Sequence, residues 1–173
     1  GPGRLYYRIG LRHVAAEPDR LAADHGFAVA RAYAGVDDPD DVRRDPDGTW
    51  RIRAGARVRV DLMLSTDAER YHVVLVDPLP AGLEALSPAL DRRGEVDDGQ
   101  VRRSAWRWWF DHDNLRDDRA EAFTASLAKG IHAYSYMARA TTQGTFTAPP
   151  TRAEEMYAPE THGRGATDRV IVE

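Results

Sequence analysis

The densest group of polar side chains in the sequence lies between Asp111 and Asp118. Oxygen ligands at alternate positions suit a hard cation such as calcium, and the EF-hand loop is the known arrangement of that kind. The spacing departs from that loop, because Leu115 and Arg116 occupy its fifth and sixth positions and Ala122 stands where the final glutamate is needed. Asp and Asn side chains commonly close turns. The sequence therefore favours a capped turn here over a calcium site.

Other residues give no pattern for catalysis. The six histidines contain no H-x-H or H-x-x-x-H pair, and no serine stands in a G-x-S-x-G motif. The chain has no cysteine, which excludes disulfides, thiol nucleophiles, zinc ribbons and iron–sulfur clusters. A hydrolase built on residues 111–118 ranks last, for want of a paired base and nucleophile. We expect a protein that is not an enzyme and has neither a cofactor nor a metal.

Three tryptophans stand close together, at Trp106, Trp108 and Trp109. Indole rings on a β-sandwich could stack on sugars, because they offer a large flat area with a polar edge. Packing against the core is the more ordinary use of such rings, whereas exposure on a loop would mark a contact surface. A carbohydrate-binding or adhesion module that uses these tryptophans is therefore kept as the alternative function.

A short segment bounded by prolines carries the other candidate contact residues. Met156 and Tyr157 could point outward as anchors, with Glu155 and Glu160 as a polar rim. Residues 153–158 are also the most helix-like piece of the chain. A capping helix that tucks Met156 and Tyr157 over an open end of the fold is the competing interpretation.

These residues need a scaffold, and apolar residues that alternate with period 2 predict that it consists of β-strands. Leu5, Tyr7, Ile9 and Leu11 share one face of an expected half-buried strand over residues 4–14, and a short helical turn is expected within residues 15–26. In the next expected strand Arg31 interrupts the apolar face, which indicates an edge or a rim position. The remaining expected strands cover residues 27–33, 50–52, 57–66, 71–76, 118–127, 131–141 and 169–172.

About eight short strands separated by turns predict an all-β fold, an antiparallel β-sandwich with one or two short helical turns. The connection after Leu83 is unusually long, so a Trp-containing insertion is expected over about residues 83–114. The 173 residues suit one domain. The 28 acidic and 24 basic residues are interspersed, so we expect no binding to nucleic acid. No apolar run is long enough to span a membrane, so we expect a soluble domain. We also expect the domain to be monomeric.

Four separated motifs carry a family resemblance. They are LYYRIGLR at residues 5–12, VDPLPAGLE at 76–84, NLRDDR at 114–119 with EAF at 121–123, and EMYAPE at 155–160 followed by residues 163–164 and 168–172. In this order they resemble the C-terminal macroglobulin domain of bacterial alpha-2-macroglobulins, over nearly the whole chain. The resemblance implies a sandwich of the macroglobulin, fibronectin-like kind, with residues 1–173 as a single C-terminal domain.

The resemblance also implies a function. Such proteins are multidomain protease traps of the cell envelope, in which a thioester formed by Cys and Gln in a neighbouring domain captures the protease. The last macroglobulin domain covers that thioester, with help from a tyrosine. Tyr157 would take this role with Met156 beside it, although Tyr134 or Tyr136 could reach a partner domain instead. The implied partners are the thioester-containing and macroglobulin domains of the same parent chain and, through the full-length parent, proteases. The implied location is extracytoplasmic.

Overall fold

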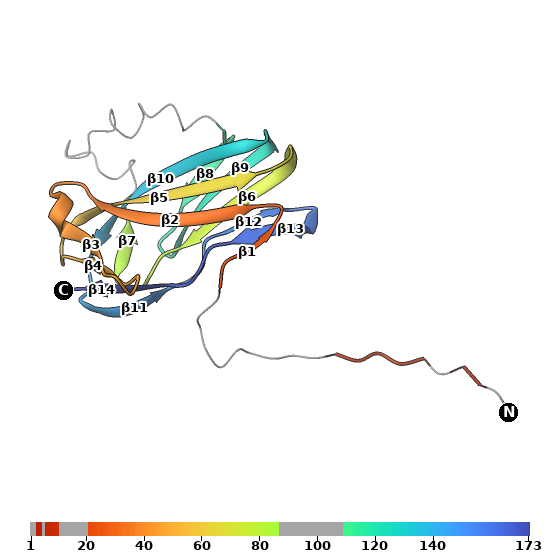
Figure 1. Ribbon diagram of the computed structural model, residues 1–173, viewed down its shortest axis with the longest axis horizontal. Helices are drawn as coiled ribbons and strands as arrows, with labels where there is room; N and C mark the ends of the chain where they lie inside the picture. Colours follow the sequence, from red (N-terminus) through yellow and green to blue (C-terminus); the bar gives the residue numbers. More distant parts are fainter. Residues whose placement is uncertain (1–2, 5, 11–20, 87–108) are drawn as a thin grey trace.

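A computed structural model describes residues 3–4, 6–10, 21–86 and 109–173 of the chain (Figure 1). Within these residues the fold is all-β, and its one helical element is the 3-10 turn η1 at Pro39–Asp41. No helix among them is long and apolar enough to cross a membrane. The all-β, antiparallel architecture predicted from the alternation of apolar residues is confirmed.

Three sheets make up the fold, and every described strand pair is antiparallel except β14 with β4. Sheet A has the order β1 (Ala23–His25), β13 (Ala158–Arg164), β12 (Arg152–Glu155), β6 (Arg70–Pro78), β9 (Arg119–Leu127) and β8 (His112–Leu115). Sheet B has the order β2 (Ala28–Gly35), β5 (Arg57–Thr66), β10 (Gly130–Ala140) and β7 (Leu83–Ala85). Sheet C has the order β11 (Gly144–Ala148), β14 (Asp168–Val172), β4 (Trp50–Ile52) and β3 (Val42–Arg44).

The core lies between sheets A and B, and the strand β5 shows why. Its even-numbered residues from Val58 to Leu64 are at most 1% exposed, whereas Arg59 and Met63 point outward. Successive side chains of a strand point to opposite faces, so this alternation buries one face and solvates the other. In the facing sheet, Val73 and Leu75 of the central strand β6 are equally buried. Sheet C closes one end of this sandwich, beside the C-terminus in Figure 1.

The expected first strand is wrong over the described residues 3–4 and 6–10. These residues form no strand, and Tyr6, Tyr7 and Ile9 are 84, 78 and 84% exposed. Figure 1 shows the segment extending away from the sandwich. Alternation alone predicts a strand but does not supply the sheet edge with which it must pair.

The helix expected over residues 153–158 is wrong as well, because β12 ends at Glu155 and β13 begins at Ala158. The part of the expected turn of residues 15–26 that is described contains strand β1. The described residues contain fourteen strands rather than about eight, because short strands such as β3, β7 and β12 carry too few residues to show alternation. Residues 87–108 of the expected insertion lie outside the described residues.

Candidate functional site at the β12–β13 turn

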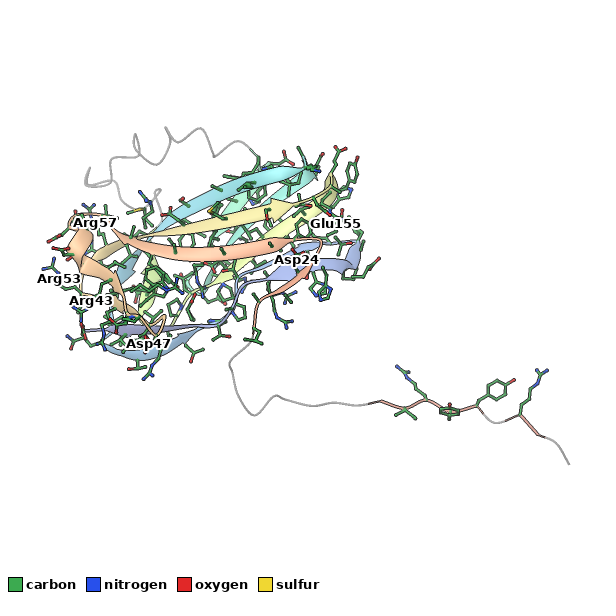
Figure 2. All side chains as sticks on the ribbon, in the orientation of Figure 1. Asp24, Arg43, Asp47, Arg53, Arg57 and Glu155 are labelled. Atoms are coloured by element: carbon green, nitrogen blue, oxygen red, sulfur yellow. The ribbon has the colours of Figure 1, made fainter. Side chains whose placement is uncertain are left out.

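Met156 and Tyr157 form the two-residue turn that joins β12 to β13. Met156 is 42% exposed and Tyr157 is 82% exposed. Because two strands rather than a helix lead into and out of this turn, the alternative in which a capping helix tucks both residues over the sandwich is wrong. Figure 2 shows the neighbouring Glu155 at the end of the sandwich opposite to Arg43 and Arg53.

The turn is attached to the adjacent strand β6 by backbone and side-chain contacts. The Met156 N–H donates to the carbonyl oxygen of His72 at 2.9 Å, and the Tyr71 N–H donates to Oε1 of Glu155 at 2.7 Å. The Tyr157 ring lies edge-on to the His72 ring, with centroids 5.1 Å apart. Glu155, expected in a polar rim, thus ties the two strands together. Tyr157 is therefore exposed to solvent, while the turn that carries it is fixed to β6 by these contacts.

His72 is the one non-glycine residue among those described that has a positive φ, at 51°. A residue with a side chain adopts this left-handed conformation at a cost, and such strain persists only where surrounding contacts enforce it. Here the His72 carbonyl accepts the bond from Met156 and its ring supports Tyr157. The sequence signalled His72 only as the one polar residue in an apolar strand, and nothing there indicated its backbone conformation.

The strain at His72 gives a prediction about substitutions. His72→Val should lower the free energy of unfolding by about 1–2 kcal/mol, because a β-branched residue fits the left-handed region badly although it normally favours strands. His72→Asn should cost less than about 0.5 kcal/mol, since Asn tolerates that region. Urea unfolding of both variants measures the difference. A valine variant as stable as the asparagine variant would contradict the strained conformation.

Large apolar side chains gather at this end of the molecule. Tyr71, whose backbone N–H donates to Glu155, is 55% exposed and lies on β6 beside the turn that carries Met156 and Tyr157. We define the hairpin tip as these three residues together with His72. Glu160 is exposed further along β13. Exposed apolar side chains that lie together, with polar residues nearby, are typical of contact surfaces.

The other tyrosines considered for contact with a partner point into the core. Tyr134 and Tyr136 are 3 and 4% exposed. Both belong to the face of β10 that packs into the sandwich. A buried ring cannot reach another domain, so these two residues are wrong as alternatives to Tyr157.

Of the three candidate tryptophans, Trp106 and Trp108 lie outside the described residues. Trp109 is half-buried against the core, and its Nε1–H donates to the carbonyl oxygen of Ala133 at 2.8 Å. Its ring lies edge-on to Phe110, with centroids 5.6 Å apart. Because both the ring and its polar edge have partners, this placement favours packing over a sugar-stacking role for Trp109.

The acidic segment 111–118 forms β8 and its turn into β9. Oδ2 of Asp111 accepts from the Ala125 N–H at 2.7 Å, and Nδ2 of Asn114 donates to Oε2 of Glu121 at 3.2 Å. The hydrogen bond from Arg119 lowers the pKa of Glu121 below its ordinary value, although partial burial opposes the shift. Over residues 21–86 and 109–173, no three His, Asp or Glu side chains are arranged to hold a metal ion. The oxygen atoms of this segment serve local hydrogen bonds.

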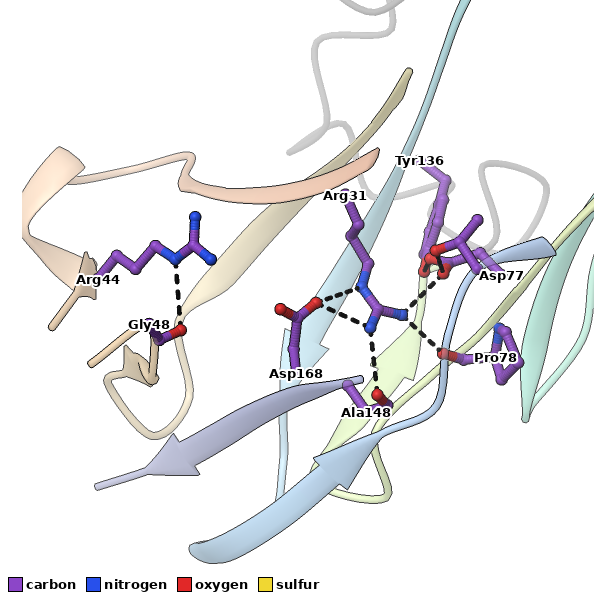
Figure 3. Close-up of polar contacts among 9 residues, drawn as sticks. Arg31, Arg44, Gly48, Asp77, Pro78, Tyr136, Ala148 and Asp168 are labelled. Atoms are coloured by element: carbon purple, nitrogen blue, oxygen red, sulfur yellow. Dashed lines mark hydrogen bonds and ion pairs between the residues drawn. The ribbon is translucent and has the colours of Figure 1, made fainter. Parts of the chain in front are cut away.

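A second polar feature lies inside the sandwich, around the guanidinium of Arg31 (Figure 3). Nη1 donates to Oδ1 of Asp77 at 2.8 Å and to the carbonyl oxygen of Pro78 at 3.2 Å. Nη2 donates to Oδ2 of Asp168 at 3.0 Å and to the carbonyl oxygen of Ala148 at 3.3 Å, and Nε donates to the same Asp168 oxygen at 3.2 Å. These contacts use all five N–H donors of the side chain. The edge position expected for Arg31 is confirmed for its strand, but its side chain is only 3% exposed.

Asp77 is the acceptor at the centre of this buried cluster, and it is fully buried. Besides the bond from Arg31, its Oδ1 accepts from Thr151 Oγ1 at 2.5 Å and its Oδ2 from the Tyr136 hydroxyl at 2.7 Å. The cluster joins β2 and β10 of sheet B, β6 of sheet A and β14 of sheet C. It therefore connects all three sheets through one guanidinium and two carboxylates, those of Asp77 and Asp168.

The surroundings of the cluster fix its charge states. Burial alone would lower the pKa of Arg31, but Tyr33, Asp77 and Asp168 outweigh it and raise that pKa above its ordinary value. Burial raises the pKa of Tyr136 well above its ordinary value, and the neighbouring Asp77 raises it further. The cluster consequently holds a charged guanidinium and a neutral tyrosine hydroxyl at neutral pH, which are the forms that its hydrogen bonds require.

Comparisons with known proteins give a consistent result. Residues 26–160 match the family described as the bacterial alpha-2-macroglobulin MG10 domain. The protein named "Circularly permutated Ras protein 2" of Dictyostelium discoideum is 31% identical over 173 residues, which is 99% of this chain and 4% of that protein. The alpha-2-macroglobulin homolog of a Nostoc strain is 28% identical over 179 residues, which is 100% of this chain and 9% of that protein. The chain thus spans less than a tenth of either relative.

Solved structures show the same likeness. Escherichia coli alpha-2-macroglobulin activated by porcine elastase has a TM-score of 0.68 and 29% identity, over 89% of this chain and 14% of that one. A Salmonella alpha-2-macroglobulin in which one tyrosine is replaced by glycine has a TM-score of 0.64 and 27% identity, over 88% of this chain and 10% of that one. The Salmonella protein reacted with methylamine has the same TM-score, identity and coverage.

Proposed function

This chain belongs to the bacterial alpha-2-macroglobulin family through its MG10 domain, and from that premise we propose that it acts as a non-catalytic domain of a protease-trapping polypeptide. In this proposal the hairpin tip packs on a neighbouring thioester domain, and Tyr157 shields the thioester. The reactive Cys belongs to that neighbour, because this chain has no cysteine. The expected arrangement of residues 1–173 as the C-terminal domain, and an extracytoplasmic location, are parts of the same proposal.

The observation that carries the proposal is the placement of Tyr157. Its ring is 82% exposed, yet it rests on His72 at a turn that hydrogen bonds fix to β6. A thioester survives in water only while water and amines are kept away, and an aromatic ring gives apolar cover with a hydroxyl that can still find a hydrogen bond. An exposed ring on a turn that is already fixed to β6 suits this role, because covering the thioester then costs little conformational entropy at the hairpin tip.

The hairpin tip is also suited to being withdrawn from the thioester when the protein is activated. Interfaces between domains of one chain are commonly modest in area and polar at their rims. A shield that consists of Tyr157 and Met156 on the turn, with Tyr71 on the adjacent strand β6, would be withdrawn by movement of the domain as a body, without unfolding of the sandwich. Cleavage of the parent by a protease would supply that movement. The Escherichia coli relative, which was solved after activation by porcine elastase, supports a parent of this kind.

The test uses the longer polypeptide that carries this domain. Tyr157→Ala should increase the rate of methylamine incorporation into the unactivated protein about tenfold, which corresponds to roughly 1.4 kcal/mol of lost protection. Tyr157→Phe keeps the ring and should stay within about twofold of the unaltered protein. Ile131→Ala removes an exposed side chain from β10 and serves as the matched control. If Tyr157→Ala incorporated methylamine no faster than Ile131→Ala, Tyr157 would not be the shield.

A further inference from the structure

Residues 6–10, which precede the sandwich, have the composition of a strand but pair with none of the strands that the structure describes. Tyr6, Tyr7 and Ile9 are 84, 78 and 84% exposed, and residues 6–10 form no ladder with any described strand. Figures 1 and 2 show the segment extended and clear of sheets A, B and C. Exposed apolar side chains on an extended chain promote aggregation unless another surface covers them.

The order of residue types in the segment specifies what kind of surface that is. Tyr7 and Ile9 alternate with Arg8 and Gly10, and Leu5 and Leu11 extend the apolar series in the sequence. This period of 2 places Tyr7 and Ile9 on one face, and Tyr6 and Arg8 on the other. A five-residue stretch is also the usual length of a strand. The pattern fits the open edge of a sheet that has one apolar face and one solvated face.

The family match indicates where that sheet lies. It begins at residue 26 and so leaves residues 6–10 outside the MG10 domain. The alignment with the Nostoc homolog nevertheless includes this whole chain, within a protein of which the chain makes up only 9%. The segment is therefore shared with the relative while standing outside the domain that both contain. A neighbouring domain of the same polypeptide accounts for both facts.

We propose that residues 6–10 form an edge strand of a β-sheet in a neighbouring domain of the same polypeptide, with Tyr7 and Ile9 packed into that domain. Backbone hydrogen bonds to the open edge hold the strand, and the pockets that receive alternate side chains set its register. The inference shares with the proposed function the premise of a longer parent, but it does not depend on Tyr157 or on a thioester. The strand joins the sandwich to its neighbour at a place separate from the hairpin tip.

Amide hydrogen exchange tests the strand directly. In the 173-residue chain, the amides of residues 6–10 should exchange at the rate of an unstructured peptide. In the longer polypeptide they should exchange at least 100-fold more slowly, because an edge ladder protects them. Equal, fast exchange in both forms would overturn the inference. Slow exchange in the 173-residue chain together with a dimeric mass would overturn it too, since a second copy would then be the partner.

A pair of double variants in the longer polypeptide tests which face of the strand packs into the neighbouring domain. Tyr7→Ser with Ile9→Ser should reduce the protection of residues 6–10 at least tenfold, whereas Tyr6→Ser with Arg8→Ser should change it less than threefold. All four positions lie outside the sandwich, so its folding is unaffected. Equal losses in the two variants would contradict the assigned face. Methylamine incorporation measured in the same preparations separates this result from the shielding by Tyr157.

Discussion

Asp77→Ala should lower the free energy of unfolding by about 3–5 kcal/mol, the usual cost of removing one partner from a buried ion pair. The fully buried carboxylate accepts hydrogen bonds from Arg31, Thr151 and Tyr136. Its removal leaves the guanidinium with only one carboxylate partner, Asp168. It also leaves two hydroxyl groups without their acceptor in the core, and each unsatisfied buried group adds a desolvation cost.

Urea unfolding at neutral pH measures this loss, and Asp67→Ala is the matched control. Asp67 also pairs with an arginine, Arg70, but its side chain is 86% exposed. Exposed pairs contribute about 0–1 kcal/mol, so the control should lose less than that. If Asp77→Ala cost no more than the control, the cluster around Arg31 would not hold the sheets together.

A double-mutant cycle then isolates the ion pair from the rest of the cluster. Arg31→Met keeps the length of the side chain while removing the charge, and it should cost about as much as Asp77→Ala. The double variant should cost at least 2 kcal/mol less than the sum of the two single losses, because neither charge is then left alone. Strictly additive losses would contradict a direct interaction between the two side chains.

The sequence predicts those parts of the fold that a single strand specifies by itself. The alternation from Val58 to Leu64 places β5 correctly, since its buried face needs only apolar residues at every second position. Residue type predicts an exposed turn with Met156 and Tyr157, but it does not predict that two strands flank that turn. Residues 153–158 are too few to separate a helix from two strand ends, and only the pairing with β6 decides between them.

Other features depend on contacts that a sequence does not display. The sequence shows Arg31 only as a break in an apolar face, because nothing nearby indicates its partners, which lie 46 and 137 positions away at Asp77 and Asp168. A lone arginine on an apolar strand face, together with an aspartate at the end of a buried strand, is the signal that could have suggested the pair. The strain at His72 has no counterpart in residue type at all. Residues 6–10 have the alternation of a strand, but within the described part of the chain no sheet edge pairs with them.

The stability of the chain should fall steeply above pH 10. Burial raises the pKa of Tyr33 and of Tyr136 above their ordinary value of 10.0, with Asp77 raising both further while Arg31 opposes the shift. Above pH 10 the unfolded chain therefore loses protons that the folded chain retains. The folded state binds more protons in this range, so the free energy of unfolding decreases as the pH rises, by about 1.4 kcal/mol per pH unit for each tyrosine. Below pH 10 this contribution is fully present.

Urea unfolding at a series of pH values between 9 and 12 should show little slope near pH 9 and, at the upper end of the range, a combined slope that approaches about 2.7 kcal/mol per pH unit from the two groups. Tyr33→Phe should halve that slope at little cost at pH 7, because its buried hydroxyl has no hydrogen-bond partner among the described residues. Tyr136→Phe should halve it too, but should cost about 1–2 kcal/mol at pH 7, since Asp77 loses a donor. If Tyr33→Phe had the same slope as the unaltered chain, the pKa of Tyr33 would be the same in the folded and the unfolded chain, which would contradict the prediction. The two variants thus separate burial, which both tyrosines share, from hydrogen bonding to the cluster, which only Tyr136 provides.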